Sequence, residues 1–425
     1  MSDEPNPSPE AERPSLGLFD AVGVEVEYML VDGESLEVRP QVDRLLEAAA
    51  GELVSEVELG DVSWSNELVL HVLELKTTAP LADPVKRLPA LHRQWRDSVR
   101  RANELAGAMQ ARLLPGAMHP WMDPHRETVL WPHEYSAVYE AYDRIFSCQG
   151  HGWSNLQSMH LNLPFRGDEE FGRLHAAIRL VLPLLPALAA SSPIADGRPT
   201  GMLDYRMEVY RHNSKRVPQV AAAIVPEPVF DEASYDEQIF QPLFEAIAPH
   251  DPDGVLRDEF LNSRGAIARF GRGSIEIRVI DSQECPLADL AIAAATVAAL
   301  ELLVAERWTP FAAQKQAATE PLAELLLRSI REGERTAVEA PDYLRHFGLR
   351  NPVPAGELWR HLVAIGLDEN LIDARTFEAP LDVLTSRGTL SSRILERTGA
   401  APSRSRLHEV WSELARCTQD DRLLV

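Results

Sequence analysis

The sequence predicts an α+β fold built on an antiparallel sheet. Short β-rich runs and longer helical runs are mixed along the chain, without the regular alternation of strand and helix that builds a parallel sheet. Residues 273–281 (GSIEIRVID) alternate apolar and polar side chains, which is typical of a half-buried strand. The 425 residues, 45% of them hydrophobic, suffice for one large domain or two.

The first 200 residues carry most of the other strand and helix signals. Pro84 opens a helical pattern, and Pro183 and Pro186 are expected to kink or split another. Four prolines make 115–135 a long ordered loop, and residues 191–201 have the composition of turns. We therefore predict strands at 19–31, 68–77 and 156–164, and helices at 40–50, 84–113, 136–147 and 169–190.

A helix that starts at Pro286 and runs to about residue 306 contains the most apolar stretch of the chain, residues 287–305. Because this stretch is rich in alanine and is interrupted by Asp289 and Glu301, we predict a buried helix and not a membrane span. From residue 310 onward the pattern is mostly helical, with breaks expected at Pro341, Pro352 and Pro380.

The net charge of −23 argues against nucleic acid or an anionic membrane as a partner. Three widely spaced cysteines without a CxxC pair predict neither a disulfide framework nor a zinc knuckle, and they suit a reducing cytoplasm. The N-terminal residues 1–15 are acidic and rich in proline. They lack the features of a signal peptide and predict a disordered tail, with order beginning near Leu16.

Two predicted strands carry paired polar side chains on one face. Glu25 and Glu27 lie two residues apart and therefore project together, as do Glu276 and Arg278. A solvated strand face explains the first pair equally well, and a structural ion pair explains the second. The functional interpretation is a metal-binding carboxylate beside an arginine whose planar fork matches phosphate oxygens.

Two further pairs are ambiguous from spacing alone. His160 shares a strand face with Asn162, and a histidine in this setting is commonly a hydrogen-bonded core residue. Glu67 and Glu74 lie seven residues apart, which places them on opposite faces of a regular strand. They converge only if a bulge intervenes or if Glu67 belongs to the preceding loop.

Several common catalytic motifs are missing from the sequence. It contains no Walker A loop, no GxGxxG after a strand, no HExxH and no GxSxG. His119, His125 and His133 are close in sequence, but their spacing matches no common structural zinc site.

Seven segments, in this order, resemble the glutamate–cysteine ligase family of the plant and bacterial carboxylate–amine ligase type, within the glutamine synthetase-like superfamily. They are GVEVEYML, ELVLHVLELKT, GAMHPWMDP, QSMHLNLP, ALAASSPIADGRPTGMLDYR, RHNSKRVPQV and ARFGRGSIEIRVID. The resemblance implies a curved antiparallel sheet that forms a half-funnel flanked by helices, as in glutamine synthetase and guanido kinases. It also implies a catalytic domain at 16–310 and a helical C-terminal extension at 311–425 packed against it.

The same resemblance implies a set of site residues. Glu27, Glu67 and Glu74 would hold one cation, and Glu25, His160 and Glu276 a second that bridges the phosphates of ATP. Gathered carboxylates require counter-ions, and oxygen ligands favour Mg²⁺ or Mn²⁺. Catalytic roles fall to Arg278, Glu276 and Arg206, and contacts to nucleotide or carboxylate groups fall to Arg269, Arg211, Arg216 and Asn162.

The implied activity is ATP-dependent ligation of the γ-carboxylate of glutamate to the amine of cysteine through a γ-glutamyl phosphate, the first step of glutathione biosynthesis. A ligase with another acid or amine, a guanidino kinase-like phosphotransferase and a non-catalytic nucleotide- and metal-binding homologue are the alternatives. Segment 140–158 and the region after 310 are expected to shape the acceptor site or a contact in a homo-oligomer. We also expect Glu276→Gln to abolish activity with little unfolding, because the metal-free site would lose repulsion.

Overall fold

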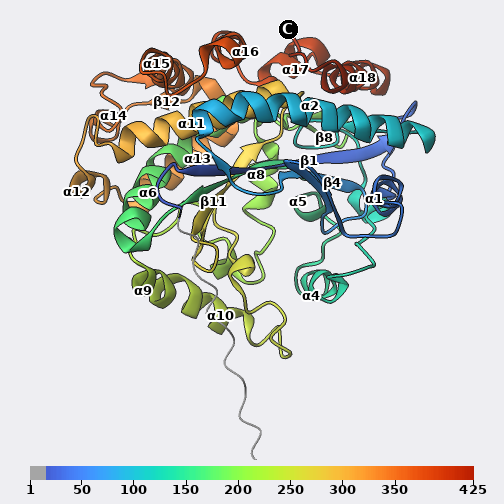
Figure 1. The fold of residues 1–425 in the computed structure, drawn as a ribbon, viewed down its shortest axis with the longest axis horizontal. Helices are drawn as coiled ribbons and strands as arrows, with labels where there is room; N and C mark the ends of the chain where they lie inside the picture. The colour runs from blue at the N-terminus through green and yellow to red at the C-terminus, as the bar shows by residue number, and fades with distance from the viewer. Residues whose placement is uncertain (1–15) are drawn as a thin grey trace, which may run out of the picture.

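A computed structural model describes residues 16–425 and contains a nine-stranded antiparallel sheet at its centre (Figure 1). The predicted tail at 1–15 lies outside the described residues. The main path of the sheet is β10-β11-β7-β1-β4-β3-β2, and β5 and β6 also pair with β1. The strands are β1 (Ala21–Asp32), β2 (Glu56–Leu59), β3 (Val62–Asn66), β4 (Val72–Thr77), β5 (Leu81–Ala82), β6 (Ala111–Leu114), β7 (Ser158–Pro164), β10 (Ala266–Arg269) and β11 (Ser274–Asp281). The predicted antiparallel sheet is therefore confirmed.

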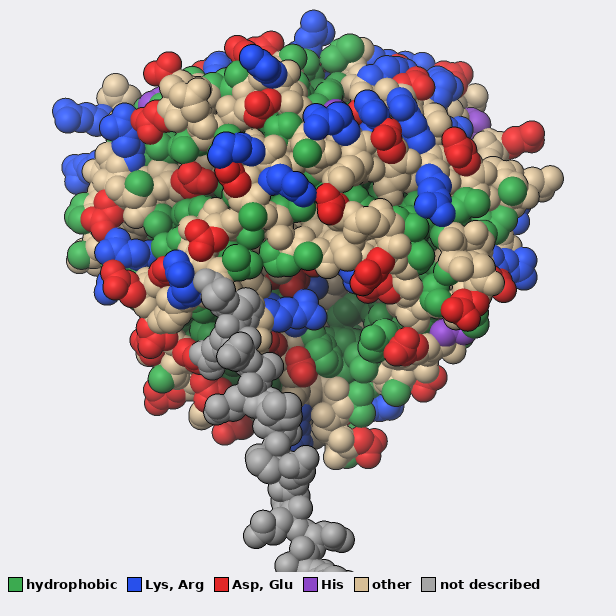
Figure 2. Space-filling view, in the orientation of Figure 1, with side chains coloured by type: hydrophobic (Ala, Val, Ile, Leu, Met, Phe, Trp, Pro, Cys, Tyr) green, Lys and Arg blue, Asp and Glu red, His purple; other side chains and the backbone are tan. Residues whose placement is uncertain are grey.

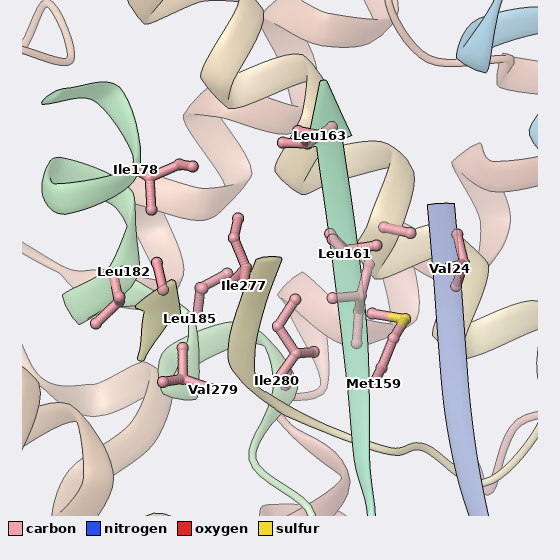
Figure 3. Close-up of a cluster of buried hydrophobic side chains, with 14 of the residues drawn as sticks. Val24, Met159, Leu161, Leu163, Ile178, Leu182, Leu185, Ile277, Val279 and Ile280 are labelled. Atoms are coloured by element: carbon pink, nitrogen blue, oxygen red, sulfur yellow. The ribbon is translucent and has the colours of Figure 1, made fainter. Parts of the chain in front are cut away.

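Helices cover one face of this sheet. Alternate residues of β1, such as Val24 and Val26, are fully buried in a core shared with Leu88 and Trp95 of α2. In Figure 3, Ile277 of β11 lies beside the side chains of α6 and the turn that follows it, and Met159 and Leu161 of β7 lie between β11 and β1. The covering helices are α2 (Pro84–Ala108), α6 (Gly167–Val181) and α11 (Pro286–Val304). The apolar side chains of each strand thus point toward these helices, and the alternate side chains point to the opposite, polar face of the sheet.

The other face of the sheet is approached by shorter helices and loops, which lie below the sheet in Figure 1. These are α4 (Ser136–Phe146), α5 (His151–Ser154), α8 (Tyr205–Tyr210), α9 (Glu232–Tyr235) and α10 (Gln241–Ile247). The remaining short elements are α1 (Val42–Ala50), α3 (Pro124–Glu127), α7 (Pro186–Ala189), the two-residue pairs β8 (Ile194–Ala195) with β9 (Arg198–Pro199) and β12 (Ala337–Val338) with β13 (Val353–Pro354), and α12 to α14 (Phe311–Gln314, Thr319–Glu332, Pro341–Arg345).

The C-terminal region is helical, as predicted, and packs against the central layer. Helices α15 (Ala355–Asp368) and α16 (Ala374–Ser386) contact α11, while α17 (Leu390–Thr398) and α18 (Arg404–Asp420) lie at the other end in Figure 1. Trp411 of α18 joins a core with Met29 and Val31 of β1. A buried ion pair, Arg393 to Glu284, adds a polar link. The domain boundary at residue 310 stays a prediction.

Helix α11 is the one described helix long and apolar enough to cross a membrane. However, 83% of its most apolar window is buried inside the protein, against α2, α6, α15 and α16. This burial agrees with the predicted core helix, because a fully apolar helix within a large domain needs cover on all sides.

Two element boundaries and one expected proline break differ clearly from the predictions. The strand expected at 68–77 begins at Val72, since the residues before it form a turn. The helix expected at 84–113 ends at Ala108, and residues 111–114 form β6 instead. Gln110 has a φ of 56°, which reverses the chain so that Leu113 pairs with Leu30 of β1. The expected break at Pro380 is wrong, because this buried proline lies inside α16.

Two other proline expectations are confirmed. Helix α6 ends at Val181, and a 3₁₀ turn at Leu182–Leu184 separates it from α7, so the segment with Pro183 and Pro186 is split. Pro341 occupies the first turn of α14, where its missing N–H is tolerated. Sequence patterns did not predict β10 or α5.

Three buried histidines predict acid sensitivity. Burial lowers the pKa of His71 to about 4 and the pKa values of His119 and His175 to about 3. His175 donates from Nδ1 to the Val229 carbonyl at 2.8 Å, and its buried Nε2 has no partner among the described residues. The unfolded chain, with histidine pKa values near 6.5, therefore binds more protons than the folded protein between pH 6.5 and 4.

As pH is lowered from 6.5 to 4, each of these histidines should lower the free energy of unfolding by up to about 1.4 kcal/mol per pH unit, whereas buried carboxylates with raised pKa values, such as Glu67, contribute in the opposite sense. Urea denaturation across this range measures the slope. His175→Phe should reduce the slope of the free energy of unfolding against pH by up to about 1.4 kcal/mol per pH unit relative to the wild type, because the contribution of this one histidine is removed. An unchanged slope in His175→Phe would contradict the assignment.

Candidate active site

Strand register brings acidic side chains together on the polar face of the sheet. Glu27 of β1 lies opposite Glu74 of β4, and Glu25 lies opposite His160 of β7. Glu276 of β11 lies opposite Asn162 on the far side of β7. The intervening residues of β1 point into the apolar core, so alternation alone separates the charged face from the buried face.

Glu67 reaches the same face from the end of β3. Ser65 lies opposite Glu74, and Glu67 follows two residues later, so it continues on the same side of the sheet. The odd spacing between Glu67 and Glu74 is thereby explained. The two residues belong to neighbouring antiparallel strands joined by a turn, and the rule for alternation along a single strand does not apply to them.

Two sets of side chains have ligand atoms close enough to hold a cation. Oxygen atoms of Glu27, Glu67 and Glu74 lie within 4.8 Å of one another, which is the first predicted set. A second set within the same distance consists of Glu25, Glu74 and His160. Among residues 16–425, Glu276 belongs to neither set, and its nearest approach to His160 is 3.9 Å between Oε1 and Nδ1.

Short polar contacts hold these carboxylates in place. Ser65 donates its hydroxyl to Glu74 at 2.9 Å, and Ser158 donates its backbone N–H to Glu27 at 2.7 Å. Asn162 donates its amide to Glu25 at 3.0 Å, so it supports the acidic face and does not line the cavity. Such contacts orient ligand atoms before a cation arrives. Sequence patterns did not single out Ser65 or Ser158, because a serine in a strand carries little signal of its own.

Arginines gather around Glu276 at one edge of the sheet. Nε of Arg278 lies 2.8 Å from Oε1 of Glu276, and Nε of Arg269 donates to Oε2 at 3.1 Å. Burial would raise the pKa of Glu276, but the two guanidinium groups outweigh it and hold the pKa at about 2. Arg272 lines the cavity nearby. This edge is therefore suited to an anion such as a polyphosphate.

Arg206 is more deeply buried than Arg269 and Arg278, and its guanidinium is paired with the carboxylate of Asp281. Its Nε donates to Asp281 in a fully buried ion pair, while its terminal nitrogens lie 3.4 Å from the Arg278 carbonyl. Asp281 is fixed in turn by the N–H of Ser191 and the hydroxyl of Ser192, both at 2.8 Å. Arg206 also lines the cavity, although its guanidinium is anchored on Asp281 and the Arg278 carbonyl and its side chain is almost fully buried.

Two predicted arginines lie elsewhere. Neither Arg211 nor Arg216 is among the described residues that line the cavity. Arg211, directly after α8, pairs with Glu208 of that helix at 2.8 Å, and Arg216 donates to the Ile145 carbonyl at 3.0 Å. The predicted contacts of these two residues with nucleotide phosphates or a substrate carboxylate have no support from this arrangement.

Lys76 is a cavity residue that sequence analysis missed. It follows Glu74 by two residues on β4, so it shares the acidic face, and it lies opposite Glu25. Its Nζ lies 2.7 Å from Glu56 and 3.8 Å from Glu74. Burial opposes the charged form, but Glu74 and Glu56 overcome this and raise its pKa. The alternation E-L-K in the strand was the available signal.

The carboxylates away from the arginines repel one another. Burial, followed by the charge of Glu27, raises the pKa of Glu67 to about 7. Burial and the charges of Glu25 and Glu67 raise the pKa of Glu74. Two such charges 4 Å apart repel by about 4 kcal/mol at an effective dielectric of 20. A divalent cation among them would reverse this balance, so the donor set and its charge fit Mg²⁺ or Mn²⁺.

The site occupies a cavity of about 1070 Å³. Figure 2 shows a hollow in the lower middle of the molecule with hydrophobic and basic side chains at its walls. The predicted segment 140–158 supplies part of the wall through Tyr142 and Trp153, whose rings lie 5.4 Å apart. Tyr139 of α4 reaches across to accept a hydrogen bond from Asn66 at 3.1 Å. Helix α4 therefore covers part of the acidic face.

Comparison with known families gives one match that covers most of the chain. Residues 21–413 match the model described as glutamate–cysteine ligase family 2. The match spans all strands of the central sheet and the helices up to α18.

Two relatives illustrate the similarity in sequence. An uncharacterised protein of Archaeoglobus fulgidus is 36% identical over 274 residues, covering 64% of this chain and 72% of that protein. A protein of Rubrobacter xylanophilus, provisionally named glutamate–cysteine ligase 2-3, is 30% identical over 195 residues, covering 44% of this chain and 48% of its own length. The chain thus spans about half of the second relative.

Two solved structures share the fold. Glutamate–cysteine ligase from Francisella tularensis, in complex with AMP, has a TM-score of 0.59 at 13% identity and covers 95% of this chain and 89% of its own. A bifunctional glutathione synthetase from Pasteurella multocida has a TM-score of 0.55 at 15% identity and covers 94% of this chain and 52% of its own.

Glu74 is common to both cation sets, so its removal tests them together. Without metal, at pH 8, we expect Glu74→Gln to raise the free energy of unfolding by about 1 kcal/mol, because repulsion with Glu25 and Glu67 is relieved. Mg²⁺ should raise the melting temperature of the wild type but not of this variant. Glu104→Gln, an exposed change on α2, serves as the control and should keep the response to Mg²⁺. A variant that still responds would contradict the shared site.

Glu276→Gln should behave differently from the expectation stated above. The glutamate neutralises Arg269 and Arg278 and is itself almost fully buried, so its replacement leaves two guanidinium groups without a counter-charge. We expect a loss of about 3 kcal/mol in the free energy of unfolding, measured by urea denaturation without metal. Unchanged or increased stability would show that repulsion dominates at this position after all.

Proposed function

Because the chain belongs to glutamate–cysteine ligase family 2, and is thus an ATP-dependent carboxylate–amine ligase, we propose that it joins the γ-carboxylate of glutamate to an amine through a γ-glutamyl phosphate. The observation that carries this proposal is the juxtaposition, on one sheet face, of two carboxylate-rich sets and an arginine cluster around Glu276. Cysteine is the acceptor that the family's name suggests. With cysteine the product is γ-glutamylcysteine, and the reaction is the first step of glutathione biosynthesis.

Two divalent cations fit the acidic residues. Glu27, Glu67 and Glu74 would hold one, and Glu25 and His160 the other, with Glu74 or Glu276 completing the second set. Bound there, such ions withdraw charge from phosphate oxygens. For Glu276 to serve as a ligand, its contacts with the arginines would have to be shared with the ion or transferred to the nucleotide.

The first step needs positive groups around the phosphoryl group in transfer. A carboxylate oxygen of glutamate attacks the γ-phosphorus of ATP, the bond to the β-phosphate oxygen breaks, and ADP leaves. Arg278 and Arg269 border the site from β11 and β10, and their planar donors can follow the phosphoryl oxygens as charge shifts. Arg206, anchored by Asp281, would hold the substrate carboxylate or the acyl phosphate.

The second step forms the amide. The lone pair of the amine attacks the acyl carbon, the bond from that carbon to the phosphate oxygen breaks, and inorganic phosphate leaves while the amine loses a proton. This sequence needs no nucleophile from the protein. The three cysteines are all free and buried, so they have no place in it and suit a reducing cytoplasm, where we propose that the reaction occurs.

A second candidate is the same chemistry with another amine. The cavity wall favours it, because it includes the aromatic side chains of Tyr139, Tyr142 and Trp153, which suit a larger apolar group than the side chain of cysteine. A guanidino kinase-like reaction would give a stable phosphorylated product without a second substrate, and a non-catalytic homologue would bind nucleotide without turnover.

Product analysis separates these possibilities. The protein is incubated with ATP, Mg²⁺, glutamate and cysteine, or with each member of a panel of amines in place of cysteine. ADP release and the mass of the product are then measured. The proposal expects ADP release that depends on both glutamate and an amine, with a product lighter by one water than the sum of acid and amine. ADP release without an amide product would contradict it.

Arg278→Lys tests the role of the guanidinium fork. A lysine keeps the charge but offers a single point donor, so we expect kcat/KM for ATP to fall by at least about 100-fold. Arg345→Lys, an exposed change on α14, is the matched control and should keep full activity. An Arg278→Lys variant with the wild-type rate would remove this residue from the phosphoryl transfer step.

A further inference from the structure

One part of the cavity differs in chemistry from the rest. It lies at the β2 edge of the sheet, between the loop that precedes β2 and the start of α4. We call it the apolar bay, and it is lined by Leu53, Val54, Leu68, Val69, Val138 and Tyr139. The hydrogen bond from Asn66 to Tyr139 and the contact of His133 with Asp43 of α1, at 3.2 Å, hold its two walls together.

The rim of the apolar bay leaves large hydrophobic side chains open to solvent. Leu53 is 51% exposed and Tyr135 is 58% exposed, and both line the cavity. Only five large hydrophobic side chains among the described residues are more than about one third exposed, and two of these five lie together at the mouth of the cavity. Exposed apolar surface at a cavity mouth indicates a ligand with an apolar body.

The charges around the apolar bay are almost all negative. Glu56, Glu67 and Glu134 line this part of the cavity, and Glu134 has no ion pair within residues 16–425. Lys76 is the one cation beside it, and Glu56 holds its Nζ at 2.7 Å. A cationic amine is attracted to such surroundings, whereas a free carboxylate on the same molecule would find no unpaired cation among the described residues of the bay.

The polyphosphate of ATP belongs at the other edge. Arg269 and Arg272 stand on or beside β10, which lies at the opposite end of the strand order from β2. The acidic cation sets lie between the two edges, on β1, β4 and β7. A nucleotide bound along the arginines would place its terminal phosphate toward the middle of the sheet, and the apolar bay then faces the reacting centre from the acceptor side.

We infer that the acceptor is a primary amine that carries a bulky apolar group and no carboxylate. The inference rests on the proposed function and refines its second substrate. In the reaction, the nitrogen of this amine forms a bond to the acyl carbon of the γ-glutamyl phosphate, the bond from that carbon to the phosphate oxygen breaks with phosphate as leaving group, and one amine proton passes to solvent. The apolar group stays in the bay.

Five amines test both halves of the inference. Phenethylamine and phenylalanine differ only by a carboxylate, and phenethylamine and ethylamine differ only by the ring. With ATP, Mg²⁺ and glutamate held constant, kcat/KM for phenethylamine should exceed the values for phenylalanine and ethylamine by at least about 10-fold each, which is 1.4 kcal/mol per tenfold step. Cysteine and its decarboxylated form, cysteamine, are compared in the same way, and cysteamine should be the better acceptor. Equal or greater efficiency with phenylalanine or cysteine overturns the inference.

Hydroxylamine separates a wrong acceptor from a wrong function. This small nucleophile traps an acyl phosphate as a hydroxamate without needing the apolar bay. Hydroxamate formation from glutamate together with no preference for phenethylamine would overturn the inference and leave the proposed function intact. A lack of hydroxamate with glutamate would overturn both, because the acceptor assignment requires the acyl phosphate.

A surface substitution places the preference in the bay. Leu53→Ser alters an exposed side chain, so the variant should fold, and it should raise KM for phenethylamine at least about 5-fold relative to KM for ATP. Leu327→Ser is the matched control, since this exposed leucine lies on α13 outside the cavity lining. Equal KM values for phenethylamine in the two variants would overturn the location.

Discussion

The structure depends on a concentration of negative charge that the fold brings together and does not fully neutralise. Five glutamates from β1, the end of β3, β4 and β11 border one cavity, and among residues 16–425 only Glu276 of these five has close arginine partners. Each unneutralised pair at 4 Å costs about 1 to 4 kcal/mol, depending on its access to water. Without metal, this electrostatic repulsion has to be offset by other interactions that stabilise the sheet. The burial of its opposite, apolar face under α2, α6 and α11 provides them.

The support extends to the last residues of the chain. Helices α17 and α18 bury Met29 and Val31 on the same strand that presents Glu25 and Glu27. His92 of α2 lies 2.6 Å from Asp421, and Arg393 pairs with Glu284 just before α11. The C-terminal region thus acts on the site indirectly. It keeps β1 in place against the repulsion of its own carboxylates, which explains why a segment far from the cavity is so well buried.

The alternation of side chains along single strands was enough to predict much of this site. Contacts between residues on either side of a turn could not be predicted in this way. Glu25 with Glu27 and Glu276 with Arg278 follow from period two within single strands. The pairing of Glu67 with Glu74 could not be derived, because the boundary at Val72 turns one apparent strand into two sides of a hairpin. Helix ends were mispredicted for a similar reason. Gln110 adopts a left-handed backbone conformation although it is not a glycine, and the buried Pro380 lies inside a helix that it was expected to end. Such outcomes depend on tertiary packing, which outweighs local preference.

The distribution of charge along the sheet also allows two substrates of opposite charge to bind in one cavity. At the β10–β11 edge the arginines need anions, and at the β2 edge the carboxylates need cations. A polyphosphate and an ammonium group would each be repelled from the other's end, so orientation follows from electrostatics before any close contact forms. The middle of the sheet, where the acids are densest, is then the one place where a cation, a phosphoryl group and an amine can meet. In the proposed reaction the γ-carboxylate would enter there as an anion, and the repulsion among the glutamates favours a cation binding before it.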